Sequence, residues 1–152
     1  MKYILALDQS TISTGFSYFN DKGEFITSGL VTAKDMHDMY FVLQELIKKY
    51  KPNVIVIEDV YYCPGKSKSF HTLANLQGLI MSICYSKKIP LFIVTASDWK
   101  TSFGIKTYRT KRNEQKQQCR DIVKEKYNID VNTDEADAIG IASWYINKSL
   151  TS

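Results

Sequence analysis

Four carboxylate side chains stand where apolar segments of the sequence end or where a predicted helix begins. Asp8 follows a short apolar run, and Glu58 follows a second run rich in β-branched residues. A carboxylate at the end of a buried strand is costly unless it is paired or bound to a metal ion. Asp134 and Asp137 are three residues apart near the start of a predicted helix, so both project from one face. All four are candidate metal ligands, although Asp134 alone is also typical of a helix start.

These acids meet at one place if the two strands are neighbours. If the strands before Asp8 and Glu58 are adjacent and parallel, both carboxylates emerge at the sheet edge where ligand sites of open α/β sheets lie. Four hard oxygen ligands without a soft ligand suit Mg²⁺ or Mn²⁺. Two such ions about 4 Å apart would stabilise both the attacking and the leaving oxygen of a phosphodiester. We therefore expect two metal ions per active site, with Asp8 as the candidate bridging ligand.

Basic residues are concentrated in one segment of the chain. The formal net charge is +4, and residues 100–126 hold nine basic residues against three acidic ones. Such an excess is either a solvated helix face or a surface that contacts phosphates. Most basic residues of the chain are lysines, which meet phosphate as point charges, whereas arginine suits bidentate base reading. If this surface binds nucleic acid, we expect contacts to the backbone more than sequence readout.

Length and composition exclude several classes of protein. At 152 residues the chain fits a single domain, 1–152, and no apolar stretch approaches the ~18 residues of a membrane span. The N-terminal apolar run is too short for a signal peptide. Cys63, Cys84 and Cys119 form no C-x-x-C pair, which predicts a reduced, cytoplasmic compartment and inert thiols. With two histidines besides, no zinc-ligand spacing exists.

The hydrophobic pattern predicts five strands, four longer helices and one short helix. The strands are expected at 3–7, 15–19, 25–31, 54–57 and 91–94. The helices are expected at 35–50, 69–87, 111–127 and 134–147, with the short one around Trp99. Asp35, Ser97 and Thr133 are the candidate helix caps. Three antiparallel strands followed by helix-connected strands predict an α/β fold with a mixed five-stranded sheet and helices on both faces.

The acids lie within segments that resemble RuvC-type Holliday-junction resolvases. These segments are DQSTISTG at 8–15, IE at 57–58, LANLQG at 73–78, WK at 99–100, KQ at 116–117 and DEADA at 134–138. Each motif alone is weak, but together they follow the family's order over nearly the whole chain. The lysine-rich, small chain is similar in particular to bacteriophage members of the family.

The resemblance implies a ribonuclease H-like fold and a homodimeric, divalent-metal endonuclease that makes paired nicks at a four-way DNA junction. The family's four catalytic acids match Asp8, Glu58, Asp134 and Asp137. Its active-site lysine best matches Lys116, and the segment between Lys100 and Lys116 is several residues longer than is usual in the family. Tyr61 matches the family's aromatic residue near the junction centre, where it would stack on an unpaired base. The other expected DNA contacts are Lys100, Lys106, Arg109, Lys111 and Arg112.

Three other functions fit part of the same pattern. The segment from Asp8 to Gly15 also resembles the phosphate loop of actin-like ATPases and sugar kinases, but 152 residues leave no room for their second domain. An RNA-processing nuclease of the same superfold would use the same acids. A non-catalytic binder of branched DNA would gain nothing from an acid cluster that repels phosphates. We therefore expect a nuclease of four-way and other branched DNA, with no small-molecule substrate.

The expected oligomer is a symmetric homodimer. Two coordinated nicks need two active sites, which a two-fold axis supplies. The apolar stripe of the predicted helix 69–87 is the candidate interface, although core packing accounts for most of that stripe. The expected location is the cytoplasm of a bacterial or bacteriophage-infected cell.

Overall fold

The computed structural model describes residues 1–151, which form one five-stranded sheet and five helices. The strands are β1 (Tyr3–Asp8), β2 (Ser13–Asn20), β3 (Phe25–Thr32), β4 (Val54–Glu58) and β5 (Leu91–Val94). The helices are α1 (Met36–Tyr50), α2 (Ser67–Lys87), α3 (Ala96–Phe103), α4 (Arg112–Tyr127) and α5 (Thr133–Leu150). The kinds and the order of these elements are as predicted, and their ends differ from the predicted ones by at most three residues.

The strand order is β3-β2-β1-β4-β5. The first three strands in this order pair antiparallel, whereas β4 is parallel to β1 and β5 is parallel to β4. The mixed sheet predicted from the sequence is therefore confirmed. In the β1–β4 register Leu7 is level with Ile57, so Asp8 and Glu58 follow at the same end of two neighbouring strands.

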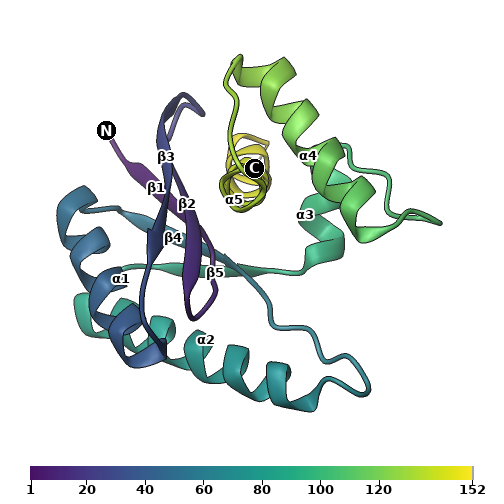
Figure 1. Ribbon diagram of the computed structural model, residues 1–152. Coiled ribbons are helices and arrows are strands. Elements are labelled where there is room, and N and C mark those ends of the chain that lie inside the picture. The colour runs from purple at the N-terminus through teal and green to yellow at the C-terminus, as the bar shows by residue number, and fades with distance from the viewer. Residues whose placement is uncertain (152) are drawn as a thin grey trace.

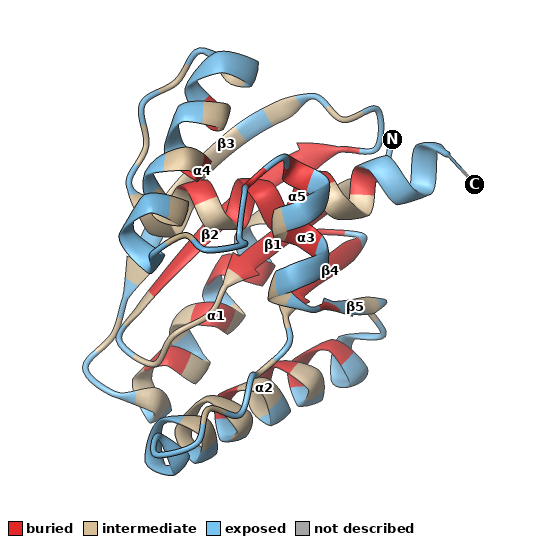
Figure 2. Ribbon diagram, turned by 90° about the vertical axis from the view of Figure 1, so that its right-hand side faces the viewer, coloured by how far each residue is buried: buried red, intermediate tan, exposed pale blue. Residues whose placement is uncertain are grey.

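Helices cover both faces of the sheet, as predicted. Alternate residues of a strand point to opposite faces, and in β1 this sends Leu5 and Leu7 to one core and Ile4 and Ala6 to the other. α1 and α2 pack on the first side, while α5, flanked by α3 and α4, packs on the second (Figure 1). Figure 2 shows the buried residues following the central strands and the inner helix faces. Burial on both sides explains why β1 and β4 are almost uninterrupted apolar runs.

Two glycines allow α5 to approach its neighbours closely. A Cβ atom on Gly15 of β2 would overlap the backbone carbonyl of Asp134, so the start of α5 could not reach the sheet. A Cβ atom on Gly140 would overlap the ring of Trp99 in α3. Only glycine fits where backbone is approached this closely. These contacts fix the position of α5 against both β2 and α3.

Two of the three predicted helix caps are wrong by one or two residues. Asp35 does cap α1, since its side chain accepts a hydrogen bond from the Asp38 amide at 2.8 Å. The caps of α3 and α5 are Thr95 and Asn132, in place of the predicted Ser97 and Thr133. The side chain of Thr95 accepts a hydrogen bond from the backbone amide of Asp98, and the side chain of Asn132 accepts one from the backbone amide of Glu135. In both helices the cap therefore lies three residues before the amide that it binds, as is usual for helix caps. No helix within residues 1–151 has the length and apolarity needed to cross a membrane.

The contact between Gly140 and Trp99 predicts a non-additive pair of mutations. Gly140→Ala is expected to lower the free energy of unfolding by about 1–3 kcal/mol, because the added methyl group overpacks the Trp99 ring. In a Trp99→Phe background, where the overlapping ring atoms are gone, the same mutation is expected to cost much less. Urea denaturation of the four proteins measures both values. Equal losses in the two backgrounds would show that this contact does not set the position of α5.

Candidate active site

The four acids predicted from the sequence line one cleft at the carboxyl ends of β1 and β4. The cleft has a volume of about 540 Å³, and we call it the acid cleft. Its wall includes the four acids Asp8, Glu58, Asp134 and Asp137 together with Lys100, Arg112, Gln115 and Lys116. The adjacent strands supply the first two acids, and the first two turns of α5 supply the others. Asp59, which follows Glu58, is exposed and does not line the cleft.

The carboxylates of the acid cleft perturb one another. Burial and, after it, the negative charges of Asp137, Glu58 and Asp134 together raise the pKa of Asp8 to about 8, against a smaller lowering by Lys116. Burial also raises the pKa of Asp137 to about 6, against a hydrogen bond from the Cys119 thiol that lowers it. An ionised carboxylate in such a place lacks both water and an adequate counter-charge. The cleft therefore has a deficit of positive charge.

A divalent cation is the group that this donor set fits. Carboxylate oxygens with no soft ligand in the cluster match Mg²⁺ or Mn²⁺, and either ion would supply the missing positive charge. Within residues 1–151, no three of the acids, cysteines or histidines are spaced to enclose an ion as they stand. Two of the carboxylates have other partners, because Glu58 accepts a hydrogen bond from Trp99 and Asp137 accepts one from Cys119.

Trp99 holds one oxygen of Glu58. The indole Nε1–H of Trp99 donates to Oε1 of Glu58 at 2.8 Å, across 41 residues of sequence. Trp99 itself is 1% exposed and packs against Gly140, so its ring has little freedom to move. A hydrogen bond from a buried donor leaves one carboxylate oxygen, Oε2, to face a ligand. Trp99 is thus a positioning residue for the second acid.

Two lysines face the acids from the opposite wall. Lys116 of α4 lowers the pKa of both Asp8 and Asp137, which places its ammonium group close to both carboxylates. Lys100 of α3 also lowers the pKa of Asp137, and its Nζ donates to Oε1 of Gln115 at 3.3 Å. The extra residues between these two lysines therefore do not prevent Lys116 from reaching the acids. The match of Lys116 to an active-site lysine is consistent with this geometry.

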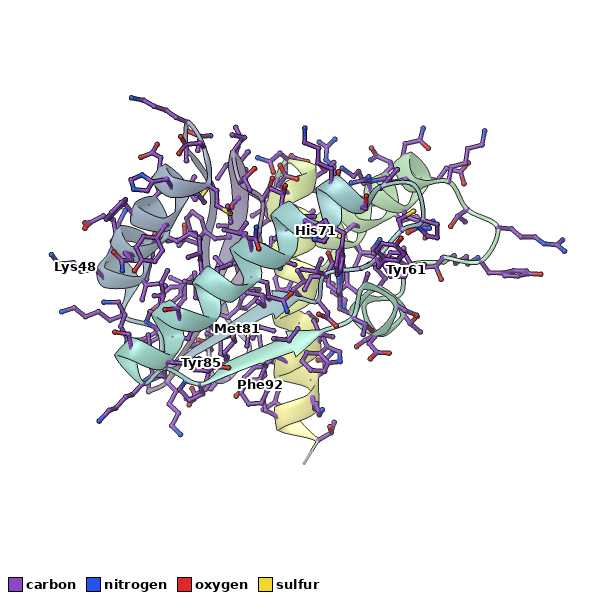
Figure 3. The ribbon with its side chains drawn as sticks, turned by 90° about the horizontal axis from the view of Figure 1, so that it is seen from below. Lys48, Tyr61, His71, Met81, Tyr85 and Phe92 are labelled. Atoms are coloured by element: carbon purple, nitrogen blue, oxygen red, sulfur yellow. The ribbon has the colours of Figure 1, made fainter. Side chains whose placement is uncertain are left out.

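The predicted DNA-contacting residues divide into two sets. Tyr61, Lys100 and Arg112 line the acid cleft, and Tyr61 is 79% exposed. In Figure 3, Tyr61 lies at the opposite end of α2 from Tyr85, on the side where the connection between α3 and α4 projects. Lys106, Arg109 and Lys111 do not line the cleft and are exposed in that connection. Both sets lie where a phosphate backbone entering the cleft could meet them.

Sequence reasoning missed three members of the site. Trp99 was not predicted as a partner of Glu58, Gln115 was not predicted as a partner of Lys100, and Cys119 was expected only to be inert. Burial raises the pKa of the Cys119 thiol, so it stays protonated and inert as a nucleophile, but it donates to Asp137. For Trp99, the sequence offered one indication of a place near the site: it immediately precedes Lys100, in a helix that follows β5. The helical spacing of Gln115, Lys116 and Cys119 could not show which face of α4 meets the acids.

The mixed five-stranded sheet covered by helices on both faces has the arrangement of the ribonuclease H-like fold. The family model described as "Crossover junction endodeoxyribonuclease RuvC" matches residues 4–144. The chain therefore belongs to the RuvC family and is an endonuclease.

Curated relatives and a solved structure agree with this assignment. The RuvC protein of Fusobacterium nucleatum is 25% identical over 154 residues, covering 95% of this chain and 80% of that protein. The RuvC protein of Syntrophomonas wolfei is 26% identical over 98 residues, covering 58% of this chain and 56% of that protein. The structure of T. thermophilus RuvC in complex with Holliday junction substrate superimposes with a TM-score of 0.73 at 11% identity, over 99% of this chain and 96% of that one. At this identity the superposition shows the shared fold.

The raised pKa of Asp8 predicts how stability depends on pH without metal. Between its unfolded pKa of about 3.8 and its folded value of about 8, the folded state holds a proton that the unfolded state has lost. The metal-free protein should therefore lose stability as the pH rises through this window. Asp8→Asn removes this penalty, so in EDTA at pH 7 it should be about 1–3 kcal/mol more stable than the wild type.

Thermal denaturation at pH 5 and pH 7, with EDTA or Mg²⁺, measures this difference. Excess Mg²⁺ is expected to stabilise the wild type more than Asp8→Asn, because binding to the folded state adds stability. Equal stability of the two proteins in EDTA at both pH values would show that the carboxylates do not repel one another as described.

The hydrogen bond from Trp99 predicts a selective loss of activity. Trp99→Phe keeps an aromatic ring but removes the donor, and it should lower kcat about tenfold, since a hydrogen bond to a charged group contributes about 1.5–3 kcal/mol. DNA binding should change little, because Trp99 is buried beneath the cleft wall. The matched control is Trp144→Phe, which changes a partly buried tryptophan outside the cleft. Equal rates in the two variants would remove Trp99 from the site.

Proposed function

We propose that this protein resolves four-way DNA junctions, and cuts other branched DNA, by paired metal-dependent nicks. The observation that carries the proposal is the convergence of Asp8, Glu58, Asp134 and Asp137 in one cleft that Lys100, Arg112 and Lys116 also line. A carboxylate cluster by itself repels DNA. With bound divalent cations the same cluster can act on a phosphodiester, which explains why it lies beside lysines that attract phosphate. The relatives' names and the T. thermophilus complex with Holliday junction substrate support the choice of substrate.

Different residues of the acid cleft have different roles in the proposed hydrolysis. Mg²⁺ or Mn²⁺, when bound by the four acids, supplies positive charge to the phosphate and lowers the pKa of a water molecule. Asp8 and Glu58 would hold the cations from the sheet, and Asp134 and Asp137 would hold them from α5. Lys116 stabilises negative charge on the phosphate as the 3′ oxygen leaves, giving 5′-phosphate and 3′-hydroxyl ends. Lys100 and Arg112 hold the DNA backbone at the rim, as electrostatic contacts to phosphate do.

The dimer that paired nicks require is proposed to form through the outward face of α2. Leu76, Ile80 and Ile83 of the predicted stripe are buried in the core, so they are not available to a partner. The opposite side of α2 exposes Tyr85 beside Met81, and both lie on the underside of the molecule in Figure 3. Exposed aromatic residues of this kind are enriched at protein interfaces. Sedimentation is expected to give about twice the 17.5 kDa of one chain.

The proposed setting is the cytoplasm of a bacterial or bacteriophage-infected cell, where branched DNA arises. The curated relatives are bacterial proteins, which supports this location. Residues 1–152 are proposed to act as one nuclease domain, because the family match spans 4–144 and both cores share one sheet.

The proposal predicts metal-dependent cleavage that follows DNA shape. End-labelled four-way junction, Y-fork and linear duplex of matched sequence are incubated with Mg²⁺, Mn²⁺ or EDTA. The wild type should nick the junction symmetrically with either metal, and each of Asp8→Asn, Glu58→Gln and Asp137→Asn should reduce the rate by several orders of magnitude. Junction binding by these variants should survive, since the basic wall is intact.

The other outcomes are equally informative. Cleavage of forks as well as junctions would support the activity on other branched DNA, whereas cleavage of junctions alone would restrict the proposal to four-way junctions. Cleavage of an RNA junction in preference to DNA would make the protein an RNA-processing nuclease and overturn the proposal. Tight binding without cleavage under any metal would leave a binding module. An amide variant that cleaves at the wild-type rate would remove that one acid from the site.

A further inference from the structure

The connection between α3 and α4 exposes an aromatic side chain among basic residues. We call residues 105–111 the Tyr108 loop. Tyr108 is 78% exposed, which is as open as Tyr61. Lys106, Arg109 and Lys111 lie in the same loop, and the loop contains no acidic residue. A large apolar ring held in water beside several cations is the combination that stacks on nucleic-acid bases while binding their phosphates.

The base of the Tyr108 loop is fixed by hydrogen bonds. The Lys106 amide donates to Oε1 of Gln118 at 2.8 Å, and the Thr110 hydroxyl donates to the Lys106 carbonyl at 2.7 Å. Nε2 of Gln115 donates to the Thr110 hydroxyl at 3.1 Å. Ile105 is buried at the start of the loop. The loop is therefore closed at its base and presents Tyr108 and Arg109 at its tip.

One face of the Tyr108 ring is already covered by a cation. The guanidinium carbon of Arg109 lies 5.1 Å from the ring centroid. Arg109 has φ of +55°, a backbone conformation that residues other than glycine adopt infrequently and that directs the turn here. A cation–π contact on one face restrains the ring and leaves the other face open. An open, restrained ring can stack on a base with little loss of side-chain entropy.

The Tyr108 loop begins and ends at the acid cleft. Ile105 and Arg112, which flank its tip on either side, both line the cleft. Tyr108 is three residues from Ile105, so an extended chain would place the two residues at most about 10 Å apart. Gln115 links the loop to the cleft, because its side chain hydrogen-bonds both to Thr110 in the loop and to Lys100 in the cleft. A base stacked on Tyr108 would thus lie within a few nucleotides of the scissile phosphate.

A second exposed tyrosine lies on another loop at the same side of the molecule. Tyr61 belongs to the connection between β4 and α2, and it also lines the acid cleft. This connection and the Tyr108 loop project in the same direction in Figure 1, and Figure 3 shows the same relation from below. Each of these two loops therefore carries one exposed tyrosine on this side of the molecule.

We propose that Tyr108 is a second stacking site for an unpaired base of branched DNA, with Arg109 and Lys111 bound to the adjacent phosphates. The inference rests on the proposed function, since it needs a DNA substrate with unpaired bases near the cut. A fully paired duplex offers no open base face to Tyr108. Branched DNA does, because bases at the branch point can unstack. The loop therefore adds selectivity for branch points, whereas the lysines of the cleft bind any phosphate backbone.

The test measures binding without cleavage. Wild type, Tyr108→Ala, Tyr108→Trp and Phe41→Ala are titrated in Ca²⁺ with a Y-fork and with a linear duplex of the same length. Each fork carries 2-aminopurine at its first unpaired base, so that stacking is seen as quenching. Phe41→Ala is the matched control, because Phe41 is a half-exposed aromatic residue on α1, away from the cleft.

Tyr108→Ala is expected to bind the fork about tenfold more weakly, to bind the duplex within twofold of the wild type, and to lose the quenching. Tyr108→Trp should keep both properties, and Phe41→Ala should match the wild type. An equal loss on fork and duplex, or no loss on either, would overturn the proposal. If the wild type itself bound fork and duplex alike, this inference would fail, whereas the proposed function would fail only if a four-way junction were also bound no better than duplex. If it preferred the fork and Tyr108→Ala kept that preference, only this inference would fail.

Discussion

The structure depends on holding four carboxylates together against their mutual repulsion. Asp8 shows the strain most clearly, because burial and three neighbouring acids raise its pKa to about 8. Carboxylates that disfavour one another's charge stay together only where they are attached to parts of the fold that are packed against each other. Asp8 and Glu58 are attached to paired neighbouring strands that are buried on both faces. Asp134 and Asp137 are attached to the helix that packs most closely on those strands.

The placement of α5 is the part of the fold on which the second pair of acids depends. Gly15 lets the backbone of Asp134 approach β2, and Gly140 lets α5 approach Trp99. Trp99 in turn donates to Glu58, so α5, α3 and β4 meet through one buried ring. The same close packing that stabilises this core therefore also sets the distance between the acids. Stability and catalytic geometry are linked here because one set of contacts determines both.

The sequence predicted the acids and the elements that carry them because both follow from local pattern. Period-two and period-3.6 hydrophobicity locates strands and helices, and a carboxylate at the end of a buried strand is unusual enough to notice. The caps Thr95 and Asn132 were missed because several neighbouring polar residues could each have capped the helix. The contact between Trp99 and Glu58 joins residues 41 apart and depends on the packing of α3 against α5, which no local pattern encodes. The face of α2 that meets the sheet was likewise decided only by packing, which buried Ile80 and exposed Tyr85.

The chemistry of the cleft and the shape of its rim favour recognition of DNA structure over recognition of sequence. Lys100 and Lys116 of the cleft meet phosphate as point charges, whereas arginine is better suited to bidentate contacts with guanine. The acids require a phosphate to enter the cleft, and a straight duplex offers that phosphate with its bases stacked and paired. The proposed stacking on Tyr61 and Tyr108 requires bases that have left the stack. Affinity from the lysines is therefore general, and discrimination has to come from the distortion that a branch point provides.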